Sequence, residues 1–392
     1  MSLRISPATR LAAVSILTRP ALHTAAKRLC IASRKEVMPS GSFRPCNAHA
    51  IRALATQSSA ASPSKPYKTH QPTSVLNSPL VHSFWDEPTS TFTFVVVCPK
   101  TKEAFIIDPV LDFDLASGKI AQRSVRGLAA FTRDQGYRVV KIIETHVHAD
   151  HLSGAYALKQ ILPEQPSIFI GSRVIEVQFR FGNTYGFKPT DYQGSFDGFM
   201  LDNEPIELGE MKGVTYNLPG HTPDSMALAF GDAVFAGDSV FLPDVGTART
   251  DFPGGSPESL YASIQKLFDR SGEVRIFSGK LDLHCQLSRT STSSDDSLSC
   301  HTANKGHDYP SGREKSCVSK VSDQMALNKH VGGPKASLET FVKMRSERDA
   351  QLGAPKLLHP SLQVNLRGGR MPRADPDGQV RLKIPLAGDL PV

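Results

Sequence analysis

The chain has 392 residues, of which 40% are apolar and 21% charged, a composition that predicts one large or two ordinary globular domains and excludes disorder throughout. No run of about eighteen apolar residues occurs, so we expect no membrane-spanning helix and no membrane partner. The six cysteines are far apart and lack paired spacing, which is typical of a chain kept reduced and excludes a disulfide scaffold.

The net charge of +7 is concentrated at the N-terminus. Residues 1–72 contain eleven Lys and Arg and one acid, Glu36, which gives +10 and leaves −3 for the other 320 residues. A mildly acidic body excludes a broad nucleic-acid footprint. The Arg-, Ser- and Ala-rich start is typical of an organelle transit peptide, and a disordered basic tail is the alternative. We expect a mitochondrial matrix protein that is cleaved between Arg52 and Thr73.

Residues 73–392 are expected to form a single domain in which strands and helices alternate. Short apolar runs predict strands at residues 91–97, 104–107, 139–143, 167–170, 214–218, 226–230, 233–236 and 274–277. Apolar periodicity predicts helices at residues 125–135, 152–162, 256–270 and 336–351. Such alternation predicts a layered α/β fold.

Two segments depart from this pattern. Residues 280–305 are crowded with Ser and Thr and have no apolar period, which predicts a disordered insert or a gene-model artefact such as a retained intron. Residues 353–392 are rich in Pro and Gly, with one strand-like piece at residues 380–385. We expect this C-terminal extension to wrap the domain surface without adding a core.

The densest chemical signal is His146-x-His148-x-Asp150-His151, which places three imidazoles and a carboxylate within six residues. It follows an expected strand, so His146 and His148 can point the same way while Asp150 and His151 approach from another side. Two adjacent metal positions are therefore within reach. Further candidate ligands come from later loops, in the order His221, Asp238 and His307.

In this order the residues resemble the metallo-β-lactamase superfamily, whose fold is an αββα sandwich of two mixed sheets with the site at one edge. Three further stretches are similar to the persulfide dioxygenases of that superfamily, which are related to glyoxalase II. These are GTARTDFPGG at residues 246–255, GHDYP at 306–310 and VNLRGG at 364–369.

The resemblance implies one Fe(II) per chain, held by His146, His221 and Asp238. Two imidazoles and one carboxylate on one face of an octahedral iron leave three positions for O₂ and a sulfur donor. The implied reaction oxidises glutathione persulfide with O₂ to sulfite and glutathione, in sulfide catabolism. The remaining residues of the set would surround this site or form a second metal site, namely His148, Asp150, His151 and His307.

The resemblance also implies two residues that meet the substrate. Arg249 would bind a glutathione carboxylate, since its guanidinium suits bidentate recognition; the alternative is a structural pair with Asp251. Tyr309 would donate its hydroxyl to the thiol and act beside Asp238 in catalysis; the alternative is a packed surface tyrosine.

Two rival functions stay open. One is a hydrolase of the glyoxalase II type, with two metals bridged by Asp238; the Pro- and Gly-rich tail disfavours it, because glyoxalase II has a helical substrate domain there. Zinc is as compatible with these ligands as iron. The other rival is an inactive homologue or a thiol-binding module, if the insert displaces His307 and Tyr309. Whether the chain forms a homodimer is left open.

Overall fold

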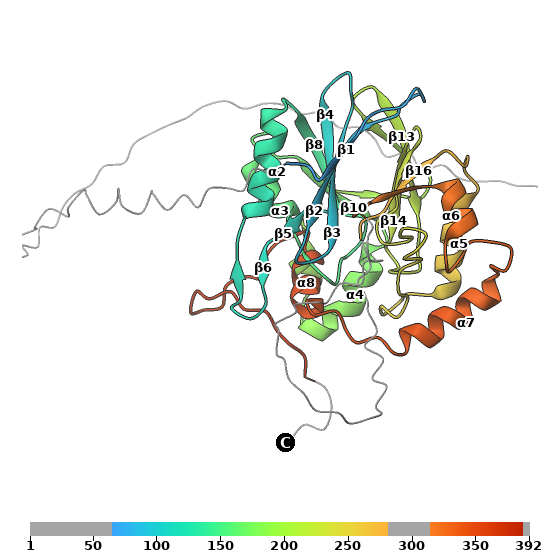
Figure 1. Cartoon of the computed structure of the whole chain (residues 1–392). Helices are drawn as coiled ribbons and strands as arrows, with labels where there is room; N and C mark the ends of the chain where they lie inside the picture. Colours follow the sequence, from blue (N-terminus) through green and yellow to red (C-terminus); the bar gives the residue numbers. More distant parts are fainter. Residues whose placement is uncertain (1–64, 281–313, 387–392) are drawn as a thin grey trace, which may run out of the picture. The chain divides into compact units, whose positions relative to one another are not determined.

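Figure 1 shows the computed structural model, which describes residues 65–280 and 314–386. These residues belong to one unit of the chain, residues 58–392. Residues 1–64 of the expected transit peptide and 281–305 of the expected insert lie outside the described residues, as do His307 and Tyr309. Within the described part, no helix is both long and apolar enough to cross a membrane.

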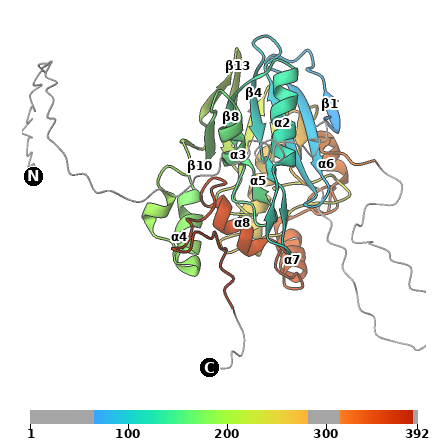
Figure 2. The same ribbon diagram turned by 90° about the vertical axis from the view of Figure 1, so that its left-hand side faces the viewer.

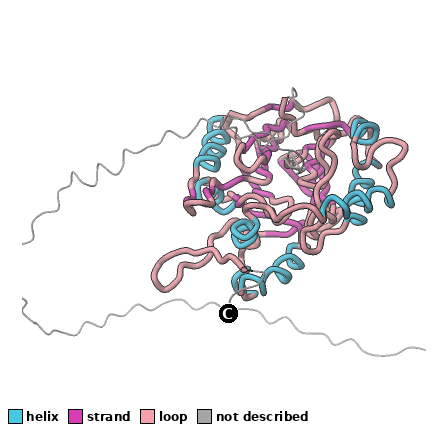
Figure 3. The backbone as a smooth tube through the Cα atoms, turned by 60° about the horizontal axis from the view of Figure 1, so that its bottom comes forward, coloured by secondary structure: helices cyan, strands magenta, loops and turns pink. Residues whose placement is uncertain are grey.

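The described strands form two large mixed sheets (Figures 1 and 3). The first has the order β1-β2-β3-β4-β8-β10-β11, with bounds Lys68–His70, Leu80–Asp86, Thr91–Val97, Glu103–Ile107, Arg138–Ile143, Ser167–Gly171 and Gly198–Met200. The second has the order β12-β13-β14-β15-β16-β17, with bounds Pro205–Leu208, Met211–Asn217, Met226–Phe230, Ala233–Phe235, Arg275–Phe277 and Val318–Lys320.

The helices cover the outer faces of these sheets. Beside the first sheet lie α2 (Arg123–Asp134), α3 (Ala155–Ile161), α4 (Val174–Tyr185) and α8 (Leu358–Asn365). Beside the second lie α5 (Pro257–Phe268), α6 (Val321–Leu327) and α7 (Leu338–Asp349). Figure 1 shows α2 and α3 on the opposite side of the sheets from α5 and α6, and Figure 2 views the molecule from the side of α2. Two short ribbons complete the described strands, β5 (Val110–Leu111) with β9 (Leu152–Ser153) and β6 (Phe113–Asp114) with β7 (Lys119–Ile120).

The alternation of side chains along the central strands produces three apolar layers. In β3, Phe92 and Phe94 face the second sheet, whereas Val95 and Val97 join the layer beneath α2 and α3. In β14, Leu228 likewise packs between the sheets, and the alanines on either side of it pack under α5. Helix, sheet, sheet and helix therefore follow one another, which confirms the expected αββα sandwich.

Two expected boundaries are wrong. The strand β1 pairs with β2 inside the segment assigned to the transit peptide, so the folded domain begins before residue 73. This three-residue edge strand is polar and largely exposed, and therefore has no apolar signal. The expected helix 152–162 begins only at Ala155, because Leu152 and Ser153 pair with β5.

The C-terminal extension also differs from expectation. It contains α8, in which Leu362 and Val364 are fully buried in the existing layer beside the first sheet, so the segment does more than wrap the surface, although it forms no second core among the described residues. The helix buries polar residues too, among them Ser361 and Gln363, which removes the amphipathic period that would have predicted it. The expected strand at residues 380–385 is absent, and that stretch is irregular.

We predict that Leu362→Ala destabilises the protein by about 2–5 kcal/mol, because it removes buried methyl groups from a closed layer. The matched control is Leu327→Ala in α6, where the leucine is 68% exposed and the cost should stay within about 0.5 kcal/mol. Urea unfolding gives both values. Equal costs would contradict the assignment of α8 to the core.

Candidate metal centre

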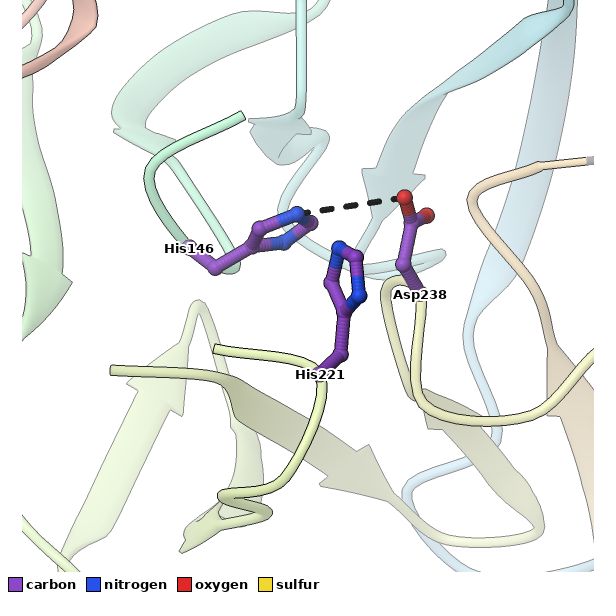
Figure 4. A group of neighbouring side chains, drawn as sticks. All are labelled: His146, His221 and Asp238. Carbon is purple, nitrogen blue, oxygen red and sulfur yellow. Dashed lines mark ion pairs between the residues drawn. The ribbon is translucent and has the colours of Figure 1, made fainter. Parts of the chain in front are cut away.

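Three loops at strand ends bring His146, His221 and Asp238 together (Figure 4). His146 follows β8, His221 lies in the turn between β13 and β14, and Asp238 follows β15. The Nε2 atom of His146 is 3.8 Å from Oδ2 of Asp238, and the ring centroids of His146 and His221 are 5.1 Å apart. One potential ligand atom from each residue lies within 4.8 Å of the others.

A backbone carbonyl fixes the tautomer of His221. Its Nδ1 atom is 2.8 Å from the carbonyl oxygen of Arg249. Because a carbonyl oxygen only accepts, Nδ1 must carry the proton and donate it. The lone pair of a neutral His221 is therefore on Nε2, where a metal ligand needs it.

A relay of two hydrogen bonds fixes His146 in the same way. The hydroxyl of Thr145 donates its single proton to Oδ2 of Asp108 at 2.8 Å. The same hydroxyl oxygen lies 3.0 Å from Nδ1 of His146, so it must accept the proton that Nδ1 donates. The lone pair of His146 is again left on Nε2, an atom that is buried and has no hydrogen-bond partner.

These residues fit a transition metal. Burial lowers the pKa of His146 well below its usual value and that of His221 to about 4, so both rings are neutral, as metal ligation requires. Two imidazole nitrogens and one carboxylate suit either iron or zinc. The donor set therefore supports a metal cofactor without selecting its identity.

A second group, His148, Asp150 and His151, also has ligand atoms within 4.8 Å of one another. Burial alone would lower the pKa of His148, but the carboxylates of Asp108 and Glu144 raise it to about 10. Those carboxylates lie 3.0 and 3.4 Å from its Nε2 atom. Burial lowers the pKa of His151 to about 3, which leaves that ring neutral.

Asp108 and Glu144 belong to the site although the sequence did not identify them. Each follows an apolar strand directly, β4 and β8 respectively, and both are buried. A carboxylate at the carboxyl end of a buried strand is the signal that could have found them. Asp150, in contrast, forms an ion pair with Lys280, which places the first residue of the expected insert inside the described fold.

The expected substrate residue Arg249 is held by its neighbours. Its Nε and Nη2 atoms donate to Asp251 at 2.5 Å, and Nη1 donates to the carbonyl of Gly353 at 3.0 Å. The loop is also held by α7, from which Arg345 donates to the carbonyls of Thr247 and Ala248 at 3.1 Å. The structural pair with Asp251 is therefore present, and the main chain of Arg249 orients His221.

Comparison with known proteins identifies the superfamily. The family model described as "Metallo-beta-lactamase superfamily" matches residues 86–280. A relative named "Glyoxylase B2", from Dictyostelium discoideum, is 34% identical over 79% of this chain and 98% of its own length. The chain belongs to the metallo-β-lactamase superfamily. Its members' metal dependence agrees with the paired imidazoles and carboxylate of the site.

Other superfamily relatives differ in the names they carry. A "Beta-lactamase hydrolase-like protein" from Xylella fastidiosa is 38% identical over 79% of this chain, and the chain spans only 65% of its length. The protein named "Persulfide dioxygenase ETHE1, mitochondrial" from Bos taurus is 29% identical over 74% of this chain and 89% of its own. Sequence similarity thus establishes the superfamily but does not identify the reaction, because the relatives carry the names of different enzymes.

The fold comparison agrees with the superfamily. The crystal structure of ETHE1 from Myxococcus xanthus matches with a TM-score of 0.54 at 23% identity, covering 74% of this chain and 99% of that one. At this level of identity the match concerns the fold alone. It confirms the expected metallo-β-lactamase architecture.

We predict that Asp238→Ala lowers bound metal at least about tenfold, because it removes the only carboxylate of the first ligand group. Metal content after desalting, measured by plasma mass spectrometry, tests this. The control Asp134→Ala removes an exposed carboxylate from α2 and should leave the content unchanged. Stoichiometric metal in Asp238→Ala would disprove this ligand assignment.

Proposed function

We propose that the chain is a non-haem Fe(II) persulfide dioxygenase that converts glutathione persulfide, O₂ and water to sulfite and glutathione. The observation on which the proposal depends is that His146, His221 and Asp238 form one group of potential ligands, distinct from the group of His148, Asp150 and His151. Iron bound by two imidazoles and one carboxylate supplies open positions for O₂ and a sulfur donor. Relatives named persulfide dioxygenase support the same reading.

The charged side chains that pair with the second ligand group (His148, Asp150 and His151) favour a site with a single metal ion. Nε2 of His148 is directed at Asp108 and Glu144, and Asp150 is paired with Lys280. Two of the three side chains in that group thus already face opposite charge within the chain. A second divalent ion would have to compete with Lys280 for Asp150, and at His148 it would have only Nδ1, which has no hydrogen-bond partner.

Within this proposal, the loops orient the metal ligands and bind the substrate. Thr145 and the carbonyl of Arg249 hold the two imidazoles with Nε2 toward the metal. The guanidinium of Arg249 would exchange Asp251 for a glutathione carboxylate, a bidentate partner of the same kind. Tyr309 would donate its hydroxyl to the thiol.

A hydrolase of the glyoxalase II type is the second candidate. It is favoured by the presence of His148, Asp150 and His151 beside the first group, and by the relative named "Glyoxylase B2". In this case Asp238 would bridge two metals. The two functions differ in a measurable way, because only the dioxygenase consumes O₂.

We predict that the iron-loaded chain consumes O₂ and releases sulfite when glutathione persulfide is added, and that Asp238→Ala abolishes both. An oxygen electrode and a sulfite assay measure the reaction, with Asp134→Ala as the active control. Hydrolysis of S-lactoylglutathione by a protein with two bound metals, without O₂ uptake, would establish the second candidate instead. Iron binding without either reaction would identify an inactive homologue.

We further propose that the protein acts in the mitochondrial matrix. The charge of +10 in residues 1–72 and the word "mitochondrial" in the name of the bovine relative support this location. The fold narrows the expected cleavage site, because Tyr67 donates its backbone N–H to Ser83 and β1 begins at Lys68. Processing that spares these contacts must occur before Tyr67.

We therefore predict a mature N-terminus between residues 52 and 67 in protein isolated from mitochondria. N-terminal peptide mass spectrometry of the endogenous protein measures it. An intact N-terminus on cytosolic protein would contradict the proposed location, and a start after His70 would contradict the role of β1 in the mature fold.

A further inference from the structure

Asn365, in the last turn of α8, contacts the loop that carries the ligand cluster. Its Oδ1 atom accepts a hydrogen bond from the backbone N–H of Ser153 at 2.8 Å. Its Nδ2 atom donates to the carbonyl oxygens of His148 and His151, each at 2.8 Å. Residues 212 to 217 positions apart in the sequence are thereby joined within a buried contact, since Asn365 is 4% exposed.

The chemistry of these three partners requires an amide. Two carbonyl oxygens need two N–H donors, and one backbone N–H needs an acceptor, so only one orientation of the Asn365 side chain satisfies all three. An ionised carboxylate at this position would face two carbonyls without a proton to donate. An apolar side chain would leave all three backbone groups buried and unpaired.

The loop depends on such side-chain partners because its backbone has few regular ones. Thr145 donates its N–H to Asp108 at 2.7 Å, and Val147 donates to Asp224 at 2.9 Å. Beyond these points, the carbonyls of His148 and His151 and the N–H of Ser153 are all held by Asn365. Asn365 thus anchors the stretch between Val147, which Asp224 holds, and the pairing of Leu152 and Ser153 with β5.

Further contacts hold the end of α8 against its surroundings. The carbonyl of Leu366 accepts a hydrogen bond from Gln178 of α4 at 2.9 Å. At Gly369, whose φ is +86°, a Cβ atom would lie 3.0 Å from the carbonyl oxygen of Ser153. The glycine therefore permits the close approach of this segment to the loop, in a conformation that side chains disfavour.

We infer that Asn365 is a positioning residue of the metal centre, which sets the path of residues 148–153, two residues after the ligand His146. The inference rests on the metal site of the proposed function and does not depend on the reaction catalysed there. Its consequence is that the C-terminal segment, remote in sequence, tunes metal binding.

Gln363 offers a matched control in the same helix. It is also a buried amide with three backbone partners, since Nε2 donates to the carbonyls of His359 and Lys383 and Oε1 accepts from the N–H of Lys383. None of these partners belongs to the ligand loop. Gln363→Glu and Asn365→Asp therefore make the same chemical change at two comparably buried sites.

The experiment measures Co²⁺ binding by the full chain, by competition with a chelating dye, together with the visible absorption spectrum of the cobalt protein. Asn365→Asp should weaken binding at least about tenfold and alter the spectrum, because the ligands are reoriented. Gln363→Glu should lower the melting temperature of the metal-free protein to a similar extent, with wild-type affinity and spectrum.

Unchanged affinity and spectrum in Asn365→Asp would overturn the inference, as would an equal loss in Gln363→Glu. If Asn365→Asp does not fold, Asn365→Ser removes the charge but offers a single proton for two carbonyls, and a wild-type spectrum in that variant would overturn the inference as well. A wild-type chain that binds no cobalt would refute the metal site itself. Failure to oxidise persulfide, by contrast, would reject only the proposed reaction.

Discussion

The rest of the site depends on the buried carboxylate of Asp108. It accepts both the backbone N–H and the hydroxyl of Thr145, and it lies 3.0 Å from Nε2 of His148. A carboxylate that is 1% exposed is costly without such partners, and although burial raises its pKa, the charge of His148 and the bonds from Thr145 hold that pKa low. The chain leaving β8 must therefore turn toward β4, which orients His146 through Thr145.

Two segments next to the ligands are then held by different distant helices. Asn365 of α8 holds the loop with His146, while Arg345 of α7 holds residues 247 and 248, next to the carbonyl that orients His221. Asp349 of the same helix accepts from the N–H of Thr250 at 2.7 Å. The outer helices of the sandwich thus do more than cover apolar faces, because their polar side chains fix the loops between the strands.

Sequence patterns predicted the elements and the ligand cluster whose residues lie close together in the chain. The strand at residues 91–97 and the helix 256–270 have clear periods, and the cluster from His146 to His151 is dense enough to indicate a metal. Asn365 carries no such signal and Asp108 only the weaker one of an acid directly after an apolar strand, because their partners lie 37 to 217 residues away in the sequence. The helix α8 was missed for a related reason, since the polar residues it buries are satisfied by partners that only the fold provides.

The net charge of the buried side chains around the two ligand groups bears on how many metal ions the site can hold. The charged side chains of the two ligand groups and their ion-pair partners are Asp108, Glu144, Asp150, Asp238, His148 and Lys280. Four carboxylates against two cations leave −2, which one divalent ion neutralises. A second divalent ion would leave an excess of two positive charges in a buried site, or of one if His148 gave up the proton that Asp108 and Glu144 stabilise. Asp108 and Glu144, which the sequence analysis did not identify, are part of this charge balance, and the balance supports a single metal ion, as the proposed dioxygenase requires.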